Sequence, residues 1–281
     1  MRKTNKIGYF IISNGRPSEQ LTYDLLKSSN VNMDDVYIVC DDLDKTLPEY
    51  IKNYGDRVVV FNKQHYIDTC DSGVQHPTGL HSVYARNAAQ DIAKEKGYEF
   101  FVISDDDIKA LHHRIIENGK LKAYIVKDIN KCLLSYIEFM KCSTHISCLG
   151  FGTNNTFIGG VNSKVFRQGF EYMAVNMALY RNDVKLNYSS ECQEDLIASM
   201  LNNSIGKLII SPPFIMVDAI VKGRNNGGNA GCYDKENMYN TYFGTLIYVP
   251  ASIRISSNID KLTKINKGNY YPMILSDRWK K

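Results

Sequence analysis

The sequence has no Cys-x-x-Cys pair, and its seven cysteines are an odd number spread over 281 residues. Closely spaced cysteine pairs are typical of zinc sites, and a dense, even set is typical of a small disulfide scaffold. Because both patterns are missing, we expect most of the cysteines to be buried reduced thiols. Reduced thiols favour a cytoplasmic protein.

Long hydrophobic runs are also missing. The first apolar segment, residues 7–12, is too short for a secretory signal peptide. No stretch approaches the roughly 18 apolar residues that a membrane-spanning helix needs. The sequence therefore predicts a soluble protein that has no membrane as a partner.

Glycine (19 residues) and proline (7 residues) are too scarce for collagen or a low-complexity chain, and no heptad pattern is sustained. Hydrophobic residues make up 44% of the chain and charged residues 23%, which is the ordinary balance of a globular protein. Neither an internal repeat nor a linker is visible. We therefore expect a single domain over residues 1–249, followed by a C-terminal extension at 250–281.

The net charge is small in total, +4, but uneven along the chain. Residues 250–281 hold seven Lys/Arg against two Asp/Glu, whereas residues 1–249 hold 27 basic and 28 acidic side chains. A basic tail is suited to an anionic partner. A tail that only aids solubility remains the alternative.

Apolar segments and amphipathic segments alternate over the first 107 residues. Buried-type strands are expected at 7–12, 36–40, 58–61 and 100–103, with helices at 18–29 and 85–93, and a long polar loop at 64–84. Further helices are expected at 129–140 and 194–201, and further strands at 146–151, 208–210 and 214–217. Continuous apolar strands are typical of parallel sheets that are covered on both faces. The pattern predicts an α/β fold with a mostly parallel sheet flanked by helices.

Polar residues follow the ends of these strands, where open parallel sheets bind their ligands. They are Arg16, Asp41, Asp42, Lys63 and the triplet Asp105–Asp107. Three successive carboxylates repel one another unless a cation neutralises them, and hard ions such as Mg²⁺ prefer oxygen ligands. A metal site is our preferred interpretation of the triplet, and a solvated acidic turn is the alternative.

Two further pairs of polar residues lie at the starts of expected helices. Arg86 and Asn87 could meet a diphosphate there, although a surface arginine is equally compatible with the pattern. Glu194 and Asp195 could supply a general base, but acids in a first helical turn also complement the helix dipole. The pair at 112–113, two histidines, is expected on a solvated turn.

Taken together, these residues resemble the nucleotide-binding half of GT-A glycosyltransferases, in which an Asp-x-Asp motif such as Asp105–Asp107 binds metal and nucleotide-sugar. The sequence is also similar, more narrowly, to the TET-associated glycosyltransferases, phage-type enzymes that add sugars to hydroxymethylated pyrimidines in DNA. The segments that carry this narrower resemblance are 14–17, 41–42, 60–63, 85–87 and 103–107.

The resemblance implies a GT-A-like donor half at about residues 1–110 and an acceptor half at about 111–249. It implies a nucleotide-sugar donor that is bound with Mn²⁺ or Mg²⁺, and a UDP-sugar is the preferred candidate. Residues Asp105 and Asp107 would hold the metal. The donor-binding set would be Arg16, Asp41, Asp42, Lys63, Arg86, Asn87, Asp105 and Asp106. Asp195, with Glu194 beside it, would be the catalytic base if the reaction inverts the anomeric centre, and would orient the acceptor if it retains it.

The resemblance further implies an acceptor hydroxyl on a hydroxymethylated pyrimidine, 5-hydroxymethylcytosine above others, in DNA. The alternative is a GT-A enzyme whose acceptor is a saccharide, a lipid or a protein. DNA contacts would come from basic side chains of the last third of the chain: Lys222, Arg224, Arg254, Lys261, Lys264 and Lys267. One feature departs from many GT-A enzymes, because no histidine follows His145 to complete the metal shell.

Overall fold

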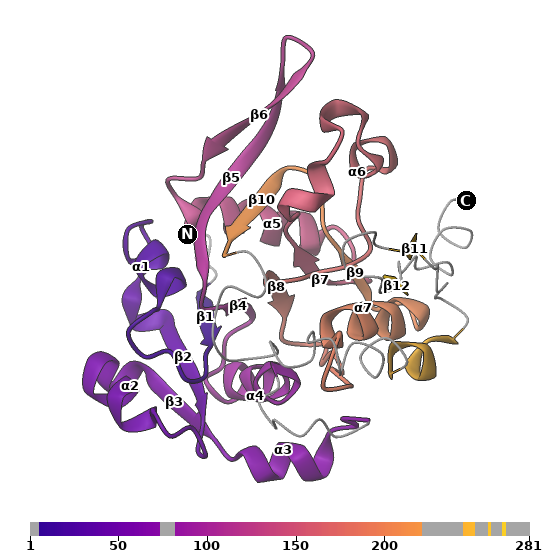
Figure 1. The fold of residues 1–281 in the computed structure, drawn as a ribbon. Helices are drawn as coiled ribbons and strands as arrows, with labels where there is room; N and C mark the ends of the chain where they lie inside the picture. Colours follow the sequence, from indigo (N-terminus) through magenta and orange to yellow (C-terminus); the bar gives the residue numbers. More distant parts are fainter. Residues whose placement is uncertain (1–5, 74–81, 221–243, 251–257, 260–265, 268–281) are drawn as a thin grey trace.

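A seven-stranded sheet lies at the centre of the fold (Figure 1). The computed structural model describes residues 6–73, 82–220, 244–250, 258–259 and 266–267. The strands of the central sheet are β1 (Ile7–Ile12), β2 (Val36–Asp41), β3 (Val58–Phe61), β4 (Phe100–Asp105), β7 (Ile146–Gly150), β8 (Met177–Arg181) and β9 (Leu208–Ile210). Their order across the sheet is β3-β2-β1-β4-β8-β7-β9.

The sheet is mostly parallel. β1 pairs in parallel with both β2 and β4, β2 with β3, and β7 with β9. Only β8, among these seven strands, runs against its neighbours β4 and β7. The α/β architecture expected for a GT-A-like protein is therefore confirmed. The sequence analysis missed β8.

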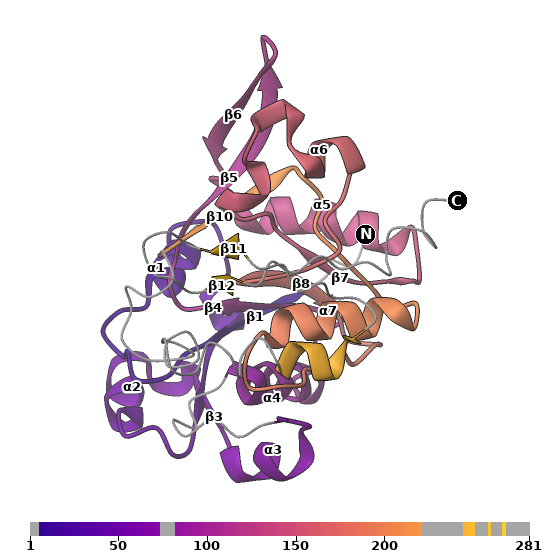
Figure 2. The same cartoon turned by 45° about the vertical axis from the view of Figure 1, so that its right-hand side comes forward.

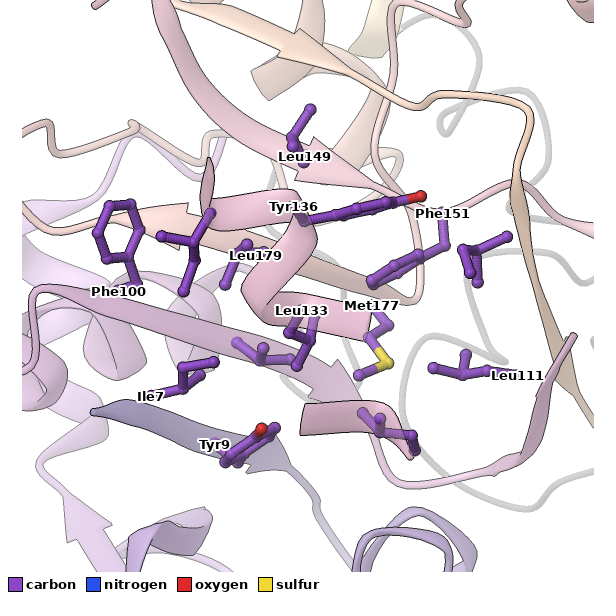
Figure 3. Packing of buried hydrophobic residues seen from close by; sticks show 14 of the residues in the cluster. Ile7, Tyr9, Phe100, Leu111, Leu133, Tyr136, Leu149, Phe151, Met177 and Leu179 are labelled. Atoms are coloured by element: carbon purple, nitrogen blue, oxygen red, sulfur yellow. The ribbon is translucent and has the colours of Figure 1, made fainter. Parts of the chain in front are cut away.

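Helices cover both faces of this sheet (Figure 2). They are α1 (Leu21–Lys27), α2 (Leu47–Tyr54), α3 (Lys63–Thr69), α4 (Ser82–Glu95), α5 (Ile129–Lys141) and α7 (Glu194–Ser204). A further helix, α6 (Lys164–Gln168), instead packs with Phe157 and Met216 beside the smaller sheet. Because successive residues of a strand point to opposite faces, Tyr9 of β1 packs in the cluster with α1 and α5, whereas Phe10 packs in the cluster with α4 and α7. Figure 3 shows the first cluster, in which Leu133 and Tyr136 of α5 lie against the sheet.

A smaller antiparallel sheet stands beside the central one. It contains β10 (Ile215–Ala219), β5 (Ile108–Glu117) and β6 (Lys120–Ile125), in the order β10-β5-β6. The β5–β6 hairpin projects from the body of the protein (Figure 1). Two strands of two residues each, β11 (Asn258–Ile259) and β12 (Asn266–Lys267), form a third sheet.

The sequence analysis missed the hairpin, although Asn118–Gly119 is a strong hairpin signal. Both residues have positive φ, 49° and 71°, as the central positions of a type I′ turn require. His112 and His113 therefore lie on β5 and not on a solvated turn, so that expectation was wrong.

Two other expectations need correction. The polar segment 64–84 is not one long loop, because residues 64–69 belong to α3 and residues 82–84 to α4. Cys192 is disulfide-bonded, whereas the other five described cysteines are free thiols and only Cys40 and Cys148 of these are buried. Within the described residues, the model has no helix long and apolar enough to cross a bilayer.

Candidate active site

The carboxyl ends of β1 and β4 lie side by side at the point where the strand order of the sheet reverses. The chain passes from β1 to β2 on one side, and β4 pairs with the other side of β1. Ile12 lies opposite Asp105 in this pairing, so the turn after β1 and the acidic triplet after β4 are neighbours. Ligands of open α/β sheets bind at the point where the strand order reverses, which is called the switch point. The turn after β1 and the acidic triplet, which the sequence analysis placed at strand ends, both lie there.

The backbone of the acidic triplet is fixed by the start of α1. The backbone N–H of Thr22 donates to the carbonyl of Asp106 at 3.1 Å, and its hydroxyl donates to the carbonyl of Asp105 at 2.6 Å. The same hydroxyl accepts from the backbone N–H of Ile108 at 3.0 Å. The turn that presents the carboxylates is therefore bound to the helix that follows β1.

Asp106 points inward to a buried polar cluster. Its carboxylate forms an ion pair with Arg16 at 2.7 Å and accepts a hydrogen bond from Ser13. Ser13 in turn contacts the hydroxyl of Tyr50 at 2.6 Å, and Gln20 donates to Ser13 at 2.7 Å. Asp106 is fully buried, whereas the Arg16 side chain keeps 18% exposure. The cluster thus holds one guanidinium at the rim of the switch point.

Burial raises the pKa of Asp106 to about 6, although Arg16 and the Ser13 hydroxyl both stabilise its charged form. Burial also raises the pKa of Asp107, and the negative charge of Asp106 beside it adds to the rise. The triplet therefore concentrates negative charge in a poorly hydrated place, which a cation would relieve.

Arg86 of α4 joins the triplet to α7. Its Nη2 lies 2.9 Å from Asp105 and its Nε lies 3.2 Å from Glu194. Ser82 also donates to Glu194. The side chains of Arg86 and Glu194 are each 6% exposed, and that of Asp105 is 30% exposed. Burial alone would lower the pKa of Arg86, but the two carboxylates outweigh it and hold this pKa above its usual value.

The end of β2 forms a second group, with Lys63 beside it. Asp41 is buried, accepts from Asn14 at 2.8 Å and lies 3.6 Å from the Lys63 ammonium. Asp42 is exposed and caps the start of α3 by accepting from the Lys63 backbone N–H at 2.9 Å. Asp41 thus shapes the turn, while Asp42 faces solvent beside it.

The Asn87 side chain forms hydrogen bonds with backbone groups of the protein. Its amide donates to the carbonyls of Val83 and Tyr188 at 3.0 and 2.9 Å, and its oxygen accepts from the Tyr188 backbone N–H at 3.3 Å. These bonds fasten the segment before α7 to α4. Its predicted role in donor binding stays a prediction.

Asp195 lies in the first turn of α7, one residue after the buried Glu194, and is half-buried. Its Oδ1 accepts from the backbone N–H of Leu196 at 2.8 Å. The turn before it is tight, because Gln193 has a left-handed backbone with φ of 59°. Because Glu194 binds Arg86 and Arg86 binds Asp105, the predicted acceptor-side and metal-side acids belong to one connected group.

The sequence analysis missed Glu191, a further buried carboxylate near α7. It is 4% exposed and accepts from the hydroxyl of Tyr84 at 2.9 Å. No short motif surrounds it, and the two residues are 107 positions apart. Its partner on α4 could be found only in three dimensions.

The triplet fits part of a metal shell. Asp105 and Asp107 are both accessible, and carboxylate oxygens are the ligands that Mg²⁺ and Mn²⁺ prefer. Within the described part of the chain, no three His, Cys, Asp or Glu side chains converge as a complete protein shell would. This donor set suits an ion that shares its coordination with substrate phosphates, as Mg²⁺ usually does.

Residues 7–226 match the TET-Associated Glycosyltransferase family, which covers more than three quarters of the chain. The chain belongs to this family. The resemblance found in the sequence is therefore confirmed. No curated protein sequence matches the chain significantly.

Three solved structures illustrate what this family member is similar to. A mannosyltransferase from Pyrobaculum calidifontis, in complex with GDP-Man and Mn²⁺, is 10% identical with a TM-score of 0.47 over 79% of this chain and 59% of its own. TarS of S. aureus is 14% identical with a TM-score of 0.45 over 88% and 40%. Glucosyl-3-phosphoglycerate synthase of Mycobacterium tuberculosis, with Mn²⁺ and UDP-Glc, is 8% identical with a TM-score of 0.49 over 96% and 88%. This chain thus spans 59% and 40% of the first two.

The predicted DNA contacts of this family member fall almost entirely outside the described residues. They are Lys222, Arg224, Arg254, Lys261 and Lys264. Lys267 belongs to β12, where its backbone pairs with Asn258. Their role in DNA binding therefore stays a prediction.

Proposed function

We propose that this protein transfers a sugar from a nucleotide-sugar to the hydroxyl of a hydroxymethylated pyrimidine in DNA. The preferred donor is a UDP-sugar, and the preferred acceptor base is 5-hydroxymethylcytosine. The observation that carries the proposal is the connected acidic group at the switch point, from Asp105 through Arg86 to Glu194. This group connects the proposed donor-binding acids to the turn of α7 that carries the candidate base. The chain that contains it belongs to the TET-associated family.

The donor side uses charge of both signs. Asp105 and Asp107 would hold Mn²⁺ or Mg²⁺ together with the diphosphate, and the ion would neutralise the charge that develops on the leaving phosphate. Arg16, which Asp106 holds at 2.7 Å and which is still partly exposed, would meet the phosphates with its guanidinium. Asp42 would accept a hydrogen bond from the nucleoside, and Lys63 would support Asp41 beneath it.

Arg86 has a different role in this proposal. Its Nη2 and Nε are already bound to two carboxylates, and its side chain is 6% exposed. We therefore assign it to positioning Asp105 and Glu194 rather than to touching the diphosphate. The geometry then couples the two halves of the site through one buried cation.

On the acceptor side, the hydroxyl oxygen attacks the anomeric carbon of the donor. The bond from that carbon to the phosphate oxygen breaks, and the nucleoside diphosphate leaves. Asp195, in the first turn of α7, would take the proton of the hydroxyl as the attack proceeds. This assignment corresponds to an inverting reaction.

Replacing Asp195 with asparagine is expected to lower kcat by about 10²–10⁴-fold, the usual contribution of a general base. The donor KM should change little, because the amide keeps the size of the side chain. Initial rates of transfer at varied donor concentration measure both. Asp56→Asn, an exposed aspartate between α2 and β3, is the matched control. A loss of less than threefold in the Asp195 variant would contradict the base assignment.

The acceptor is tested with duplex DNA that contains 5-hydroxymethylcytosine and with an otherwise identical duplex that contains cytosine. Each is incubated with the enzyme, Mn²⁺ and one of a panel of UDP-sugars, and the nucleosides are analysed by mass spectrometry. We expect one sugar residue on the hydroxymethylated base and none on cytosine. Transfer to a saccharide, lipid or protein acceptor with no transfer to hydroxymethylated DNA would overturn the proposal.

A further inference from the structure

The β5–β6 hairpin carries an excess of positive charge. Residues 108–127 hold five Lys/Arg, at 109, 114, 120, 122 and 127, against the single acid Glu117. Its outer part is well exposed: Lys120 and Lys122 are exposed, and Tyr124 is 45% exposed. This basic hairpin, as we call residues 108–127, was not among the sites that the sequence predicted.

The segment that packs against the hairpin is basic as well. Arg114 lies over the ring of Phe157 at 4.8 Å, and Leu121 packs in the same cluster as Phe157. Residues 152–170, which contain Phe157, add exposed Lys164 and Arg167 and no acid. The two segments together hold seven basic side chains and one acidic, whereas the rest of the chain holds 27 basic and 29 acidic. Positive charge is thus concentrated on this projection.

One face of the hairpin, which we call the free face, is exposed over its outer part among the described residues. Directly opposed residues of an antiparallel pair share a face, and Ile115 lies opposite Lys122 while His113 lies opposite Tyr124. Arg114 and Leu121 belong to the other face, which packs only in part on Phe157, because Ile116 and Ile125 of that face are 53% and 62% exposed. The free face therefore combines ammonium groups with an exposed tyrosine and an isoleucine that is 46% exposed.

The hairpin starts at the candidate active site. Ile108, the first residue of β5, follows Asp107 directly. The backbone N–H of Ile220, just after β10, donates to the carbonyl of Asp107 at 3.2 Å. A long partner that lies along the hairpin is therefore guided toward the acidic triplet.

We propose that the basic hairpin binds the acceptor as double-stranded DNA, with Lys120 and Lys122 on phosphates and the free face against the major groove. This inference rests on the proposed function. The major groove admits a two-stranded β-ribbon, and it exposes the C5 substituents of pyrimidines. Lysine–phosphate contacts provide affinity and orientation. The hairpin thus presents a hydroxymethylated base to the site at its root.

The chemistry of the tip favours DNA over a membrane surface. The turn itself consists of Glu117, Asn118, Gly119 and Lys120, which are polar or charged, although Ile115 and Ile116 beside it are 46% and 53% exposed. Glu117 accepts a hydrogen bond from the hydroxyl of Tyr124 at 2.7 Å, which leaves the ammonium groups as the dominant charge of the face.

The test replaces both lysines of the free face, Lys120→Ala with Lys122→Ala. We expect the KM for hydroxymethylated duplex DNA to rise about tenfold, and the slope of log affinity against log salt to become shallower by about 2. The donor KM should stay unchanged. The matched control is a double variant of two exposed lysines outside the hairpin, Lys52→Ala on α2 with Lys94→Ala on α4, and it should behave as wild type. Circular dichroism melting checks that each variant is folded.

Binding of unmodified duplex DNA, followed by fluorescence anisotropy, separates the two proposals. Hairpin-dependent binding by an enzyme that transfers no sugar to hydroxymethylated DNA would support the hairpin's role and overturn the proposed function. Transfer to DNA with equal binding and KM in wild type and hairpin variant would overturn the hairpin's role alone. Vesicles containing phosphatidylserine form the last arm. Hairpin-dependent binding to these vesicles without binding to DNA would also overturn the inference.

Discussion

Replacing Asp105 with asparagine is expected to lower sugar transfer by about 10³-fold, the range found when one well-placed electrostatic contact to a reacting group is removed. The carboxylate lies at the switch point, is 30% exposed, and is held by Arg86 at 2.9 Å. The amide removes the negative charge that a divalent ion needs and leaves the side-chain size almost unchanged. Initial rates with saturating donor and acceptor measure the loss.

Donor binding separates a lost metal site from a damaged fold. Titration calorimetry of the wild type with a UDP-sugar should show tighter binding with Mn²⁺ than with EDTA, and this difference should vanish in Asp105→Asn. Asp107→Asn should also lose the Mn²⁺ effect, while the control Asp56→Asn should keep it. Wild-type rates in excess EDTA, or a fully active Asp105→Asn enzyme, would contradict the metal assignment.

The switch-point site was predictable because its signals are local. Six consecutive buried residues form β1, and a polar turn follows at once. β4 has the same character and ends at Asp105. A parallel sheet brings the carboxyl ends of such strands to one edge. The sequence therefore indicated which residues gather, without indicating how they are connected.

The connections depend on contacts between distant residues. Arg86 meets Glu194 across 108 positions, and Ser13 meets Asp106 across 93. No periodicity encodes such a pair, because both partners also look like ordinary residues of a helix start or a turn. The structure was needed to show that Asp106 points into a buried cluster while Asp105 stays accessible.

The small sheet was missed for another reason. Residues 108–117 do not alternate strictly between apolar and polar, since one face of β5 changes from buried at its root to exposed at its tip. A period-2 pattern appears only where one face is uniformly covered. The turn residues Asn118 and Gly119 were the better signal, because their φ values of 49° and 71° suit few other residues.

Replacing Arg86 with methionine is expected to lower stability by about 3–5 kcal/mol, because it leaves a buried carboxylate without its cation. Glu194 is 6% exposed and would lose the guanidinium at 3.2 Å, while Asp105 would lose its partner at 2.9 Å. For a chain of this size the melting temperature should fall by about 10 °C. Thermal unfolding followed by circular dichroism provides the measurement.

A second substitution distinguishes positioning from simple support of the fold. Adding Glu194→Gln to Arg86→Met removes the buried negative charge that has lost the guanidinium, so much of the lost stability should return. Transfer should stay low in the double variant, because Asp105 still lacks the group that orients it. Arg86→Lys keeps the positive charge but cannot bond both carboxylates through a planar fork, so it should melt near the wild type and still transfer slowly. If the double variant recovered both stability and transfer, Arg86 would support only the fold.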